Sequence, residues 1–189
     1  MKQDASLRAL LICADDATAE RVLAFLPENV SPVRSESAPA SMPVLERGDA
    51  ELVIAAEPFL QDVDGSLLPT LLREERICLL LLTETDAPRP LLTERGALVL
   101  PCACPDFLLQ QAVQLLVATR LRLRKLESRA ARLEAHVEDM RLINRAKLLL
   151  VQQLKMTEAE AHRYIEKQAM DTCRKRRTIA ESIIRTYEA

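Results

Sequence analysis

The N-terminal part of the chain alternates short apolar runs with stretches of helical character. Four apolar runs have the length of a strand and do not alternate with polar residues; they are Leu7–Cys13, Leu52–Ala56, Ile77–Thr83 and Ala97–Leu100. Unbroken runs of this length are typical of strands buried on both faces of a parallel sheet. Val30–Arg34 is a weaker fifth strand, and the predicted helices are Ala17–Leu26, Pro39–Arg47, Ser66–Arg73 and Ala87–Arg95. This order predicts a doubly wound, flavodoxin-like α/β domain with a five-stranded parallel sheet over residues 1–108.

From Phe107 onward the pattern is that of helix alone, because the last 83 residues contain neither Gly nor Pro. Capping signals divide this stretch. Thr157 and Glu160 have the spacing of a capping box, in which each side chain bonds the backbone N–H of the other residue. We therefore expect one helix to end near Leu154 and the next to begin at Thr157. Thr178 and Glu181 repeat the spacing and predict the start of a third helix.

The first of these helices carries a heptad repeat. The a positions are Leu116, Leu123, Ala130, Val137 and Asn144, and the d positions are Leu126, Leu133 and Met140. Such a seam is typical of a coiled coil. We predict that its large apolar residues form the interface of a homodimer, with residues 109–137 as the dimerisation helix. The alternative is a single amphipathic helix that docks on its own domain.

The charges that flank the seam favour parallel chains. In this register Arg122 and Arg129 take g positions and face Glu127 and Glu134 at the e positions of a parallel partner. Asn144 at an a position is the kind of polar residue that fixes register and oligomeric state at some cost in stability.

The net charge of −2 hides a strong asymmetry between the two ends of the chain. Residues 1–119 hold 9 Lys and Arg against 18 Asp and Glu, a balance of −9, whereas residues 120–189 hold 17 against 10, a balance of +7. Such asymmetry is typical of a basic module that binds a polyanion, joined to an acidic module with another task. Two solvated faces of one protein remain the alternative.

Composition excludes several other classes of protein. No apolar run is longer than six residues, the length of Ile77–Leu82, whereas a membrane-spanning helix needs about 20. The five cysteines form no C-x-x-C pair, so we expect neither a disulfide framework nor a metal site, and we expect a reducing cytoplasm. No Ser/His/Asp or Cys/His set at suitable positions suggests an enzyme, and no cofactor is expected.

The C-terminal segment, residues 138–189, resembles a known family. The matching positions are Ile143–Lys147, Leu149–Leu150, Thr157–Glu158, Glu160–Ala161, Ile165, Ala169–Met170, Ile179–Ala180 and Ile183–Ile184. This pattern is similar to the ANTAR domain, the three-helix RNA-binding module of bacterial transcription antiterminators. The order of the parts resembles AmiR/NasT-like antiterminators, which implies binding to hairpins in nascent leader mRNA and control by a ligand-sensing regulatory protein.

Cations and flat side chains in this segment agree with a nucleic-acid partner. The candidate RNA-binding residues are Arg141, Arg145, Lys147, His162, Arg163, Tyr164, Lys167, Arg174, Lys175, Arg176 and Arg177. The cations gain affinity for phosphate through counterion release, and the two rings can stack on unpaired bases or serve only to cap a small helical core. Charge alone favours DNA and RNA equally, and only the resemblance favours RNA.

The N-terminal domain resembles a response-regulator receiver that has lost its phosphorylation chemistry. Asp15 and Asp16 stand where a receiver has its acidic pair, and Thr83 stands at the hydroxyl position. The acceptor Asp is replaced by Ala56, or by Glu57 if the alignment slips by one, and no Lys follows the fifth strand. Without a carboxylate nucleophile no acyl phosphate forms. We therefore interpret the domain as a pseudo-receiver controlled by protein contact, with Asp15 and Asp16 as a helix cap.

Three classes of function follow from the sequence. The favoured one is a dimeric RNA-binding antiterminator that prevents termination. The alternatives are a phosphorylation-responsive regulator that binds nucleic acid and a coiled-coil adaptor without a nucleic-acid role.

Overall fold

The computed structural model describes residues 6–57, 67–74, 76–84 and 90–188. Within these ranges the chain divides into two compact units, Met1–Arg124 and Lys125–Ala189. No helix of the described residues is long and apolar enough to cross a membrane.

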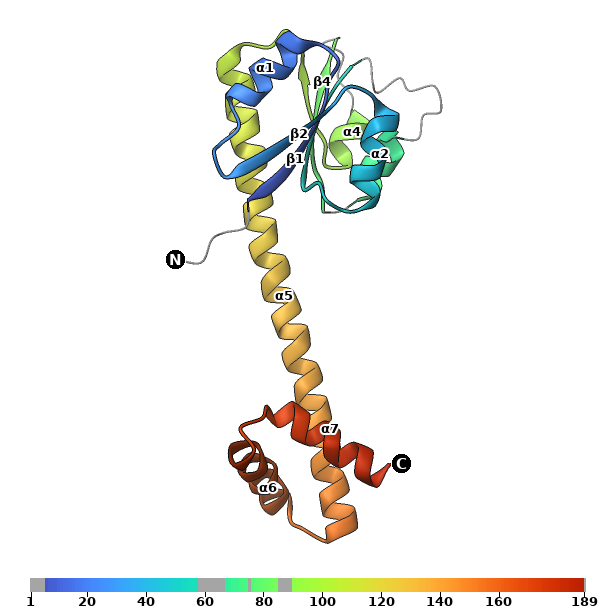
Figure 1. The fold of residues 1–189 in the computed structure, drawn as a ribbon, viewed down its shortest axis with the longest axis vertical. Helices are drawn as coiled ribbons and strands as arrows, with labels where there is room; N and C mark the ends of the chain where they lie inside the picture. Colours follow the sequence, from blue (N-terminus) through green and yellow to red (C-terminus); the bar gives the residue numbers. More distant parts are fainter. Residues whose placement is uncertain (1–5, 58–66, 75, 85–89, 189) are drawn as a thin grey trace. The chain divides into compact units, whose positions relative to one another are not determined.

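The first unit is built on a five-stranded parallel sheet with the strand order β2-β1-β3-β4-β5 (Figure 1). The strands are β1 (Leu7–Ile12), β2 (Val30–Ser35), β3 (Leu52–Ala56), β4 (Cys78–Thr83) and β5 (Leu98–Pro101). This order confirms the flavodoxin-like fold. Each predicted strand begins and ends within one residue of the observed one, because buried strands of a parallel sheet are apolar on both faces and stand out from their neighbours.

Helices cover both faces of this sheet. They are α1 (Asp16–Ala24), α2 (Ala38–Glu46), α3 (Leu67–Arg73), α4 (Pro90–Glu94) and the first part of α5 (Asp106–Leu154). One core cluster joins α1 and α5 to one face of the sheet, and a second cluster joins α2, α3 and α4 to the other face. The prediction of a helix over Ala87–Arg95 lies partly outside the described residues.

The start of α5 belongs to the first unit. Leu109, Val113, Leu116 and Val117 of α5 are buried in the cluster that covers the sheet. Leu116 therefore packs inside its own domain, which corrects the partner-facing position that the heptad pattern assigned to it. Periodicity alone does not separate a face that packs within the chain from one that packs on a partner. The compact unit accordingly extends to Arg124, beyond the expected boundary at residue 108.

The second unit is a three-helix module formed by α5 from Lys125 onward, α6 (Glu158–Asp171) and α7 (Arg176–Tyr187). Its core includes three alanines that are fully buried, Ala146, Ala161 and Ala180, one from each helix. Small side chains at these contacts let the helices approach closely, and Leu150 and Ile165 fill the space around them.

The capping box at the start of α6 is confirmed. The Glu160 N–H donates to Thr157 Oγ1 at 3.3 Å, and the Thr157 N–H donates to Glu160 Oε2 at 2.8 Å. This backbone hydrogen bond to the carboxylate lowers the pKa of Glu160. The second predicted box is wrong. α7 begins at Arg176 with Lys175 as its N-cap, and Thr178 already lies within the helix.

Candidate functional site

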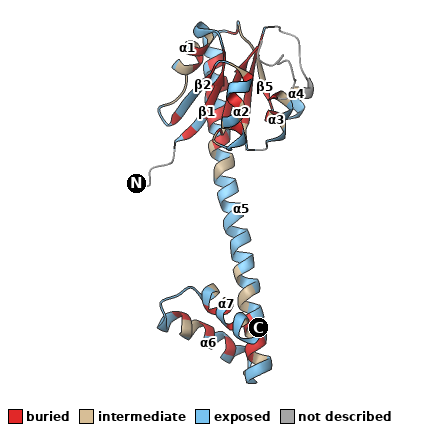
Figure 2. Cartoon of the chain, turned by 45° about the vertical axis from the view of Figure 1, so that its right-hand side comes forward, coloured by how far each residue is buried: buried red, intermediate tan, exposed pale blue. Residues whose placement is uncertain are grey.

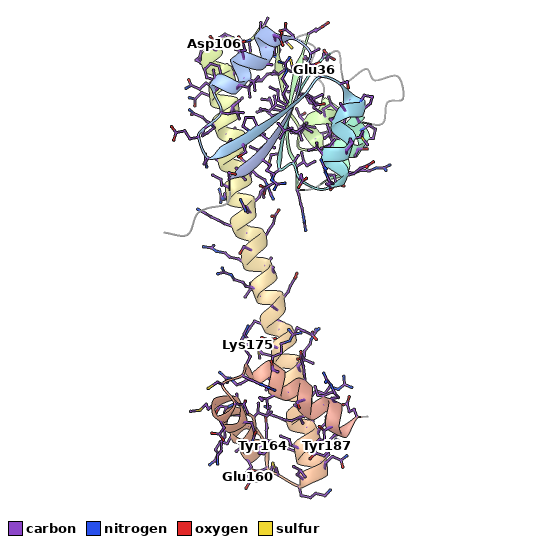
Figure 3. The ribbon with its side chains drawn as sticks, viewed as in Figure 1. Glu36, Asp106, Glu160, Tyr164, Lys175 and Tyr187 are labelled. Carbon is purple, nitrogen blue, oxygen red and sulfur yellow. The ribbon has the colours of Figure 1, made fainter. Side chains whose placement is uncertain are left out.

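A groove with a basic rim lies on the second unit, where α5 faces the start of α6 and of α7. It encloses about 480 Å³. We call it the basic groove; its walls are His136, Asp139, Met140, Ile143, Asn144 and Lys147 of α5, His162 of α6, and Lys175, Arg176 and Arg177 at the start of α7. Figure 3 labels Lys175 at this end of α7. Four cations against one carboxylate give the walls a positive balance, which suits an anionic ligand.

Several cations of this unit are held by carboxylates. Lys147 Nζ lies 2.9 Å from a Glu158 oxygen, and Arg176 lies 3.1 Å from Glu166. Arg177 bridges Glu181 at 2.8 Å and Asp139 at 3.0 Å. The pKa of Arg177 is raised, chiefly by the hydrogen bond to Glu181, and the pKa of Glu158 is lowered by Lys147. These pairs fix the direction of each side chain and partly offset its charge.

Arg174 and Lys175 differ from these paired cations. Both are exposed, and within the described ranges neither takes part in an ion pair. Lys175 also caps α7 without any side-chain hydrogen bond. The full charge of both residues is therefore presented to solvent, beside the positive end of the α7 dipole.

The basic groove gathers only some of the residues predicted from the sequence. It contains Lys147, His162, Lys175, Arg176 and Arg177. The remaining candidates lie outside it: Arg141, Arg145, Arg163, Tyr164, Lys167 and Arg174. Arg145 is paired with Glu188, and Arg141 lies 3.7 Å from Glu138. Arg163 and Lys167 are exposed on α6, where Figure 3 labels Tyr164.

The sequence analysis did not connect His136, Ile143 and Asn144 with this site. A signal existed, because His136, Met140, Ile143, Asn144 and Lys147 follow the spacing of one helix face. The heptad interpretation had assigned Met140 and Asn144 to the dimer seam instead, and the structure places both in the wall of the basic groove.

A second surface of note is an apolar stripe along α5. Leu126, Leu133, Val137 and Met140 are 49%, 66%, 48% and 51% exposed. We call these four residues the apolar stripe. Every residue from 125 to 138 is exposed in the single chain (Figure 2). Leu123 lies at the boundary and is partly buried against the core of the first unit.

In the first unit, the side chains at the end of the sheet that corresponds to the phosphorylation site of receivers form other contacts. Asp15 caps α1, because Asp15 Oδ2 accepts from the Thr18 N–H at 2.8 Å. Hydrogen bonds from the Thr18 side chain and from the Thr18 N–H lower the pKa of Asp15. Asp16 pairs with Arg34 at 2.6 Å. The interpretation of Asp15 as a helix cap is confirmed, and Asp16 is the first residue of the helix.

The acceptor position is apolar and closed. Ala56 is buried at the end of β3, and the neighbouring Glu57 is 8% exposed. Glu57 Oε2 accepts from the Glu84 N–H at 2.7 Å, so this carboxylate ties the end of β3 to the end of β4. Thr83 is buried and its hydroxyl donates to the Leu100 carbonyl at 3.4 Å.

Arg21 of α1 occupies the region after β5 where a receiver has its Lys. Its guanidinium donates to the carbonyls of Cys102, at 2.8 Å, and of Cys104, and pairs with Asp106 at 2.6 Å. The hydrogen bond that Arg21 donates to Asp106 is the main cause of the raised pKa of Arg21. This cation is thus used to fasten the loop that leads into α5.

Three cysteines, Cys13, Cys102 and Cys104, lie near this edge. Cys13 and Cys104 are buried in the same core cluster, with Cys102 packed against it. Burial raises the pKa of the Cys13 and Cys102 thiols. In the part of the chain that the structure describes, no three His, Cys, Asp or Glu side chains group closely enough to hold a metal ion.

Comparison with known proteins identifies the second unit. The ANTAR domain family matches residues 131–184. The curated proteins contain no match. Among solved structures, a fusion that carries the trimeric coiled coil of yeast Spc42 is 14% identical, with a TM-score of 0.47, and the match covers 72% of this chain and 92% of that one. A likeness this distant carries no argument about function. Residues 131–184, with their three helices and their core of buried alanines, are an ANTAR domain that follows an α/β domain with the receiver fold.

Proposed function

We propose that this protein is a dimeric RNA-binding transcription antiterminator, controlled by protein contact and not by phosphorylation. The observation that carries the proposal is the ANTAR domain at residues 131–184, since this family is the RNA-binding module of antiterminators. In the proposed mechanism two copies of the domain hold hairpins in nascent leader mRNA. The competing terminator then does not form, and transcription continues into the downstream genes.

The charge of the second unit supports an RNA ligand. The basic groove and the exposed Arg174 and Lys175 provide cations on one side of the ANTAR domain. Neutralising phosphates with such cations releases condensed counterions, which supplies much of the affinity for nucleic acid. The groove also presents the imidazoles of His136 and His162. Flat side chains and amides among cations are what recognition of unpaired bases needs.

The apolar stripe supports dimerisation. A helix that exposes Leu126, Leu133 and Val137 on one side gains free energy in water when a partner covers these side chains. In a parallel pair Leu126, Leu133 and Val137 meet their own copies. Arg122 and Arg129 then meet Glu127 and Glu134 of the second chain. The proposed dimer therefore begins after Leu116, which is buried in the first unit.

The first unit supports control by protein contact. Its acceptor position is Ala56, Asp16 pairs with Arg34, and Arg21 is bound to the loop after β5. None of these groups is arranged to receive a phosphoryl group. The balance of −9 over residues 1–119 suits a partner with a basic surface, and the resemblance implies a ligand-sensing regulatory protein in that role.

Acetyl phosphate with Mg²⁺ tests the absence of phosphorylation. We expect no labile phosphoryl adduct by intact-mass analysis and no change in RNA affinity, because Ala56 has no carboxylate nucleophile. A receiver with an acceptor Asp serves as the positive control. An acid-stable modification elsewhere has no bearing on the proposal, whereas a labile adduct on Glu57 or Asp62 contradicts it.

The two alternative functions, a phosphorylation-responsive regulator and a coiled-coil adaptor, require different features of the protein. A phosphorylation-responsive regulator needs an acceptor carboxylate, and a coiled-coil adaptor has no use for the basic groove. Read-through of a terminator in a purified transcription reaction tests the proposed function directly, because only an antiterminator increases it.

A further inference from the structure

We infer that the basic groove receives one unpaired base of the bound RNA, with the Asn144 amide against the edge of the base and Lys175 against its phosphate. This inference rests on the proposed function. It also assigns to Asn144 a role in RNA recognition, in place of the role in the dimer seam that the heptad pattern predicts.

The shape and chemistry of the groove fit a nucleotide. Its volume of about 480 Å³ lies within the range of about 300–1,000 Å³ that is usual for small-ligand pockets. Met140 and Ile143 provide apolar surface, and His136 and His162 provide two imidazoles. A base extruded from a loop has two flat apolar faces and a polar edge, so it needs this combination of stacking surface and hydrogen-bonding groups.

Asn144 supplies the amide among the groove walls. Its amide carries both a donor and an acceptor, and an Asn can therefore form a bidentate pair with a base edge. It is exposed, as a residue that reads a ligand must be before binding.

The charges of the groove favour a phosphate beside that base. Arg176 and Arg177 are held by Glu166, Glu181 and Asp139, which fixes their direction and consumes part of their charge. Lys175 is exposed at the start of α7, and no ion pair of this residue occurs within the described ranges. It is therefore the wall residue whose charge is offset least by carboxylates. A phosphate bound at Lys175 would offset the net positive charge of the groove walls.

The experiment uses the full chain and a two-hairpin RNA selected on it from a pool with randomised loops. Each loop nucleotide of this RNA is replaced in turn by an abasic one. We expect one abasic position to weaken binding to the wild type by about tenfold or more, and Asn144→Leu to weaken binding to the intact RNA by a similar factor. The two changes together should cost no more than either alone, because they remove the same contact.

Two controls separate this result from other effects of the substitution. Gln153→Leu also replaces an exposed amide on α5 by Leu, and Gln153 does not line the groove; it should leave RNA affinity unchanged. Sedimentation of Asn144→Leu should match that of the wild type. A variant that binds RNA normally but changes its oligomeric state would place Asn144 in the seam and overturn the inference.

The other outcomes are equally decisive. If RNA is selected but no abasic position couples to Asn144→Leu, the groove does not hold a base, and the proposed function still stands. If no RNA is selected, the proposed function itself fails and the inference fails with it. If free nucleoside monophosphates compete with RNA at micromolar concentration in an Asn144-dependent manner, the groove is a site for small nucleotides and the assignment to RNA is wrong.

Discussion

Leu126→Lys combined with Leu133→Lys is expected to convert the dimer into monomers. Both residues are d positions of the apolar stripe, about half and two thirds exposed in the single chain. Burying one Leu side chain contributes at least about 1.5 kcal/mol. The dimer buries Leu126 and Leu133 from both chains, four Leu side chains in all, so the variant loses on the order of 6 kcal/mol. Association should weaken by about 10⁴-fold or more. Sedimentation equilibrium over a range of protein concentrations measures this change.

The matched control is Ser128→Lys combined with Ala135→Lys. These residues have the same spacing of seven, lie on the outer face of the heptad and are exposed. The control adds the same charge to the same stretch of helix and should remain dimeric. Neither variant disturbs a core within the chain, so circular dichroism should be unchanged. A wild type that is monomeric, or a Leu variant that stays dimeric, contradicts the parallel coiled coil.

Replacing Arg174, Lys175, Arg176 and Arg177 by Ala is expected to weaken RNA binding by about a hundredfold or more at moderate salt. The slope of log affinity against log salt should also become shallower, by about one for each phosphate contact that is lost. Filter binding at several salt concentrations measures both quantities. Unchanged affinity and slope would mean that the basic run is only a solvated linker.

The structure refines this prediction by splitting the four residues into two pairs. Arg176 and Arg177 are bound to carboxylates and must exchange them for phosphate, whereas Arg174 and Lys175 are in no ion pair of the described residues. Arg174→Ala with Lys175→Ala should therefore lose more affinity than Arg176→Ala with Arg177→Ala. Removing the exposed cations Arg73 and Arg76 of the first unit controls for net charge.

The strands and the start of α6 could be predicted because their signals are local. A run such as Leu52–Ala56 is apolar at every position since the sheet is covered on both faces. Thr157 and Glu160 satisfy each other within one turn. The fold therefore follows from short stretches of sequence that need no knowledge of their distant neighbours.

The errors arose where distant parts of the chain decide the outcome. Leu116 continues the heptad spacing of Leu123, yet Leu116 is buried in the core cluster that covers the sheet. Leu116 is therefore not available to a coiled-coil partner, whereas residues further along α5 are exposed. Thr178 has a capping spacing, but the N-cap of α7 is Lys175, three residues before Thr178. Arg21 of α1 binds the loop after β5, a contact between distant parts of the chain that no local pattern reveals.

The candidate site was predicted only in part for the same reason. The basic run before Ile179 is visible in the sequence, whereas the pairing of Arg177 with Asp139 joins residues that are far apart in the chain. The basic groove exists because α5, α6 and α7 each contribute walls. Its composition therefore depends on how the three helices pack.

Terminator read-through in a purified, single-round transcription reaction tests the central claim most directly. The template carries the selected two-hairpin sequence upstream of an intrinsic terminator. We expect wild-type protein to increase read-through, and Leu126→Lys with Leu133→Lys to give no increase although each monomer keeps its ANTAR domain. No increase with the wild type, or an equal increase on a template without the hairpins, would contradict the proposal that this protein is an RNA-binding antiterminator.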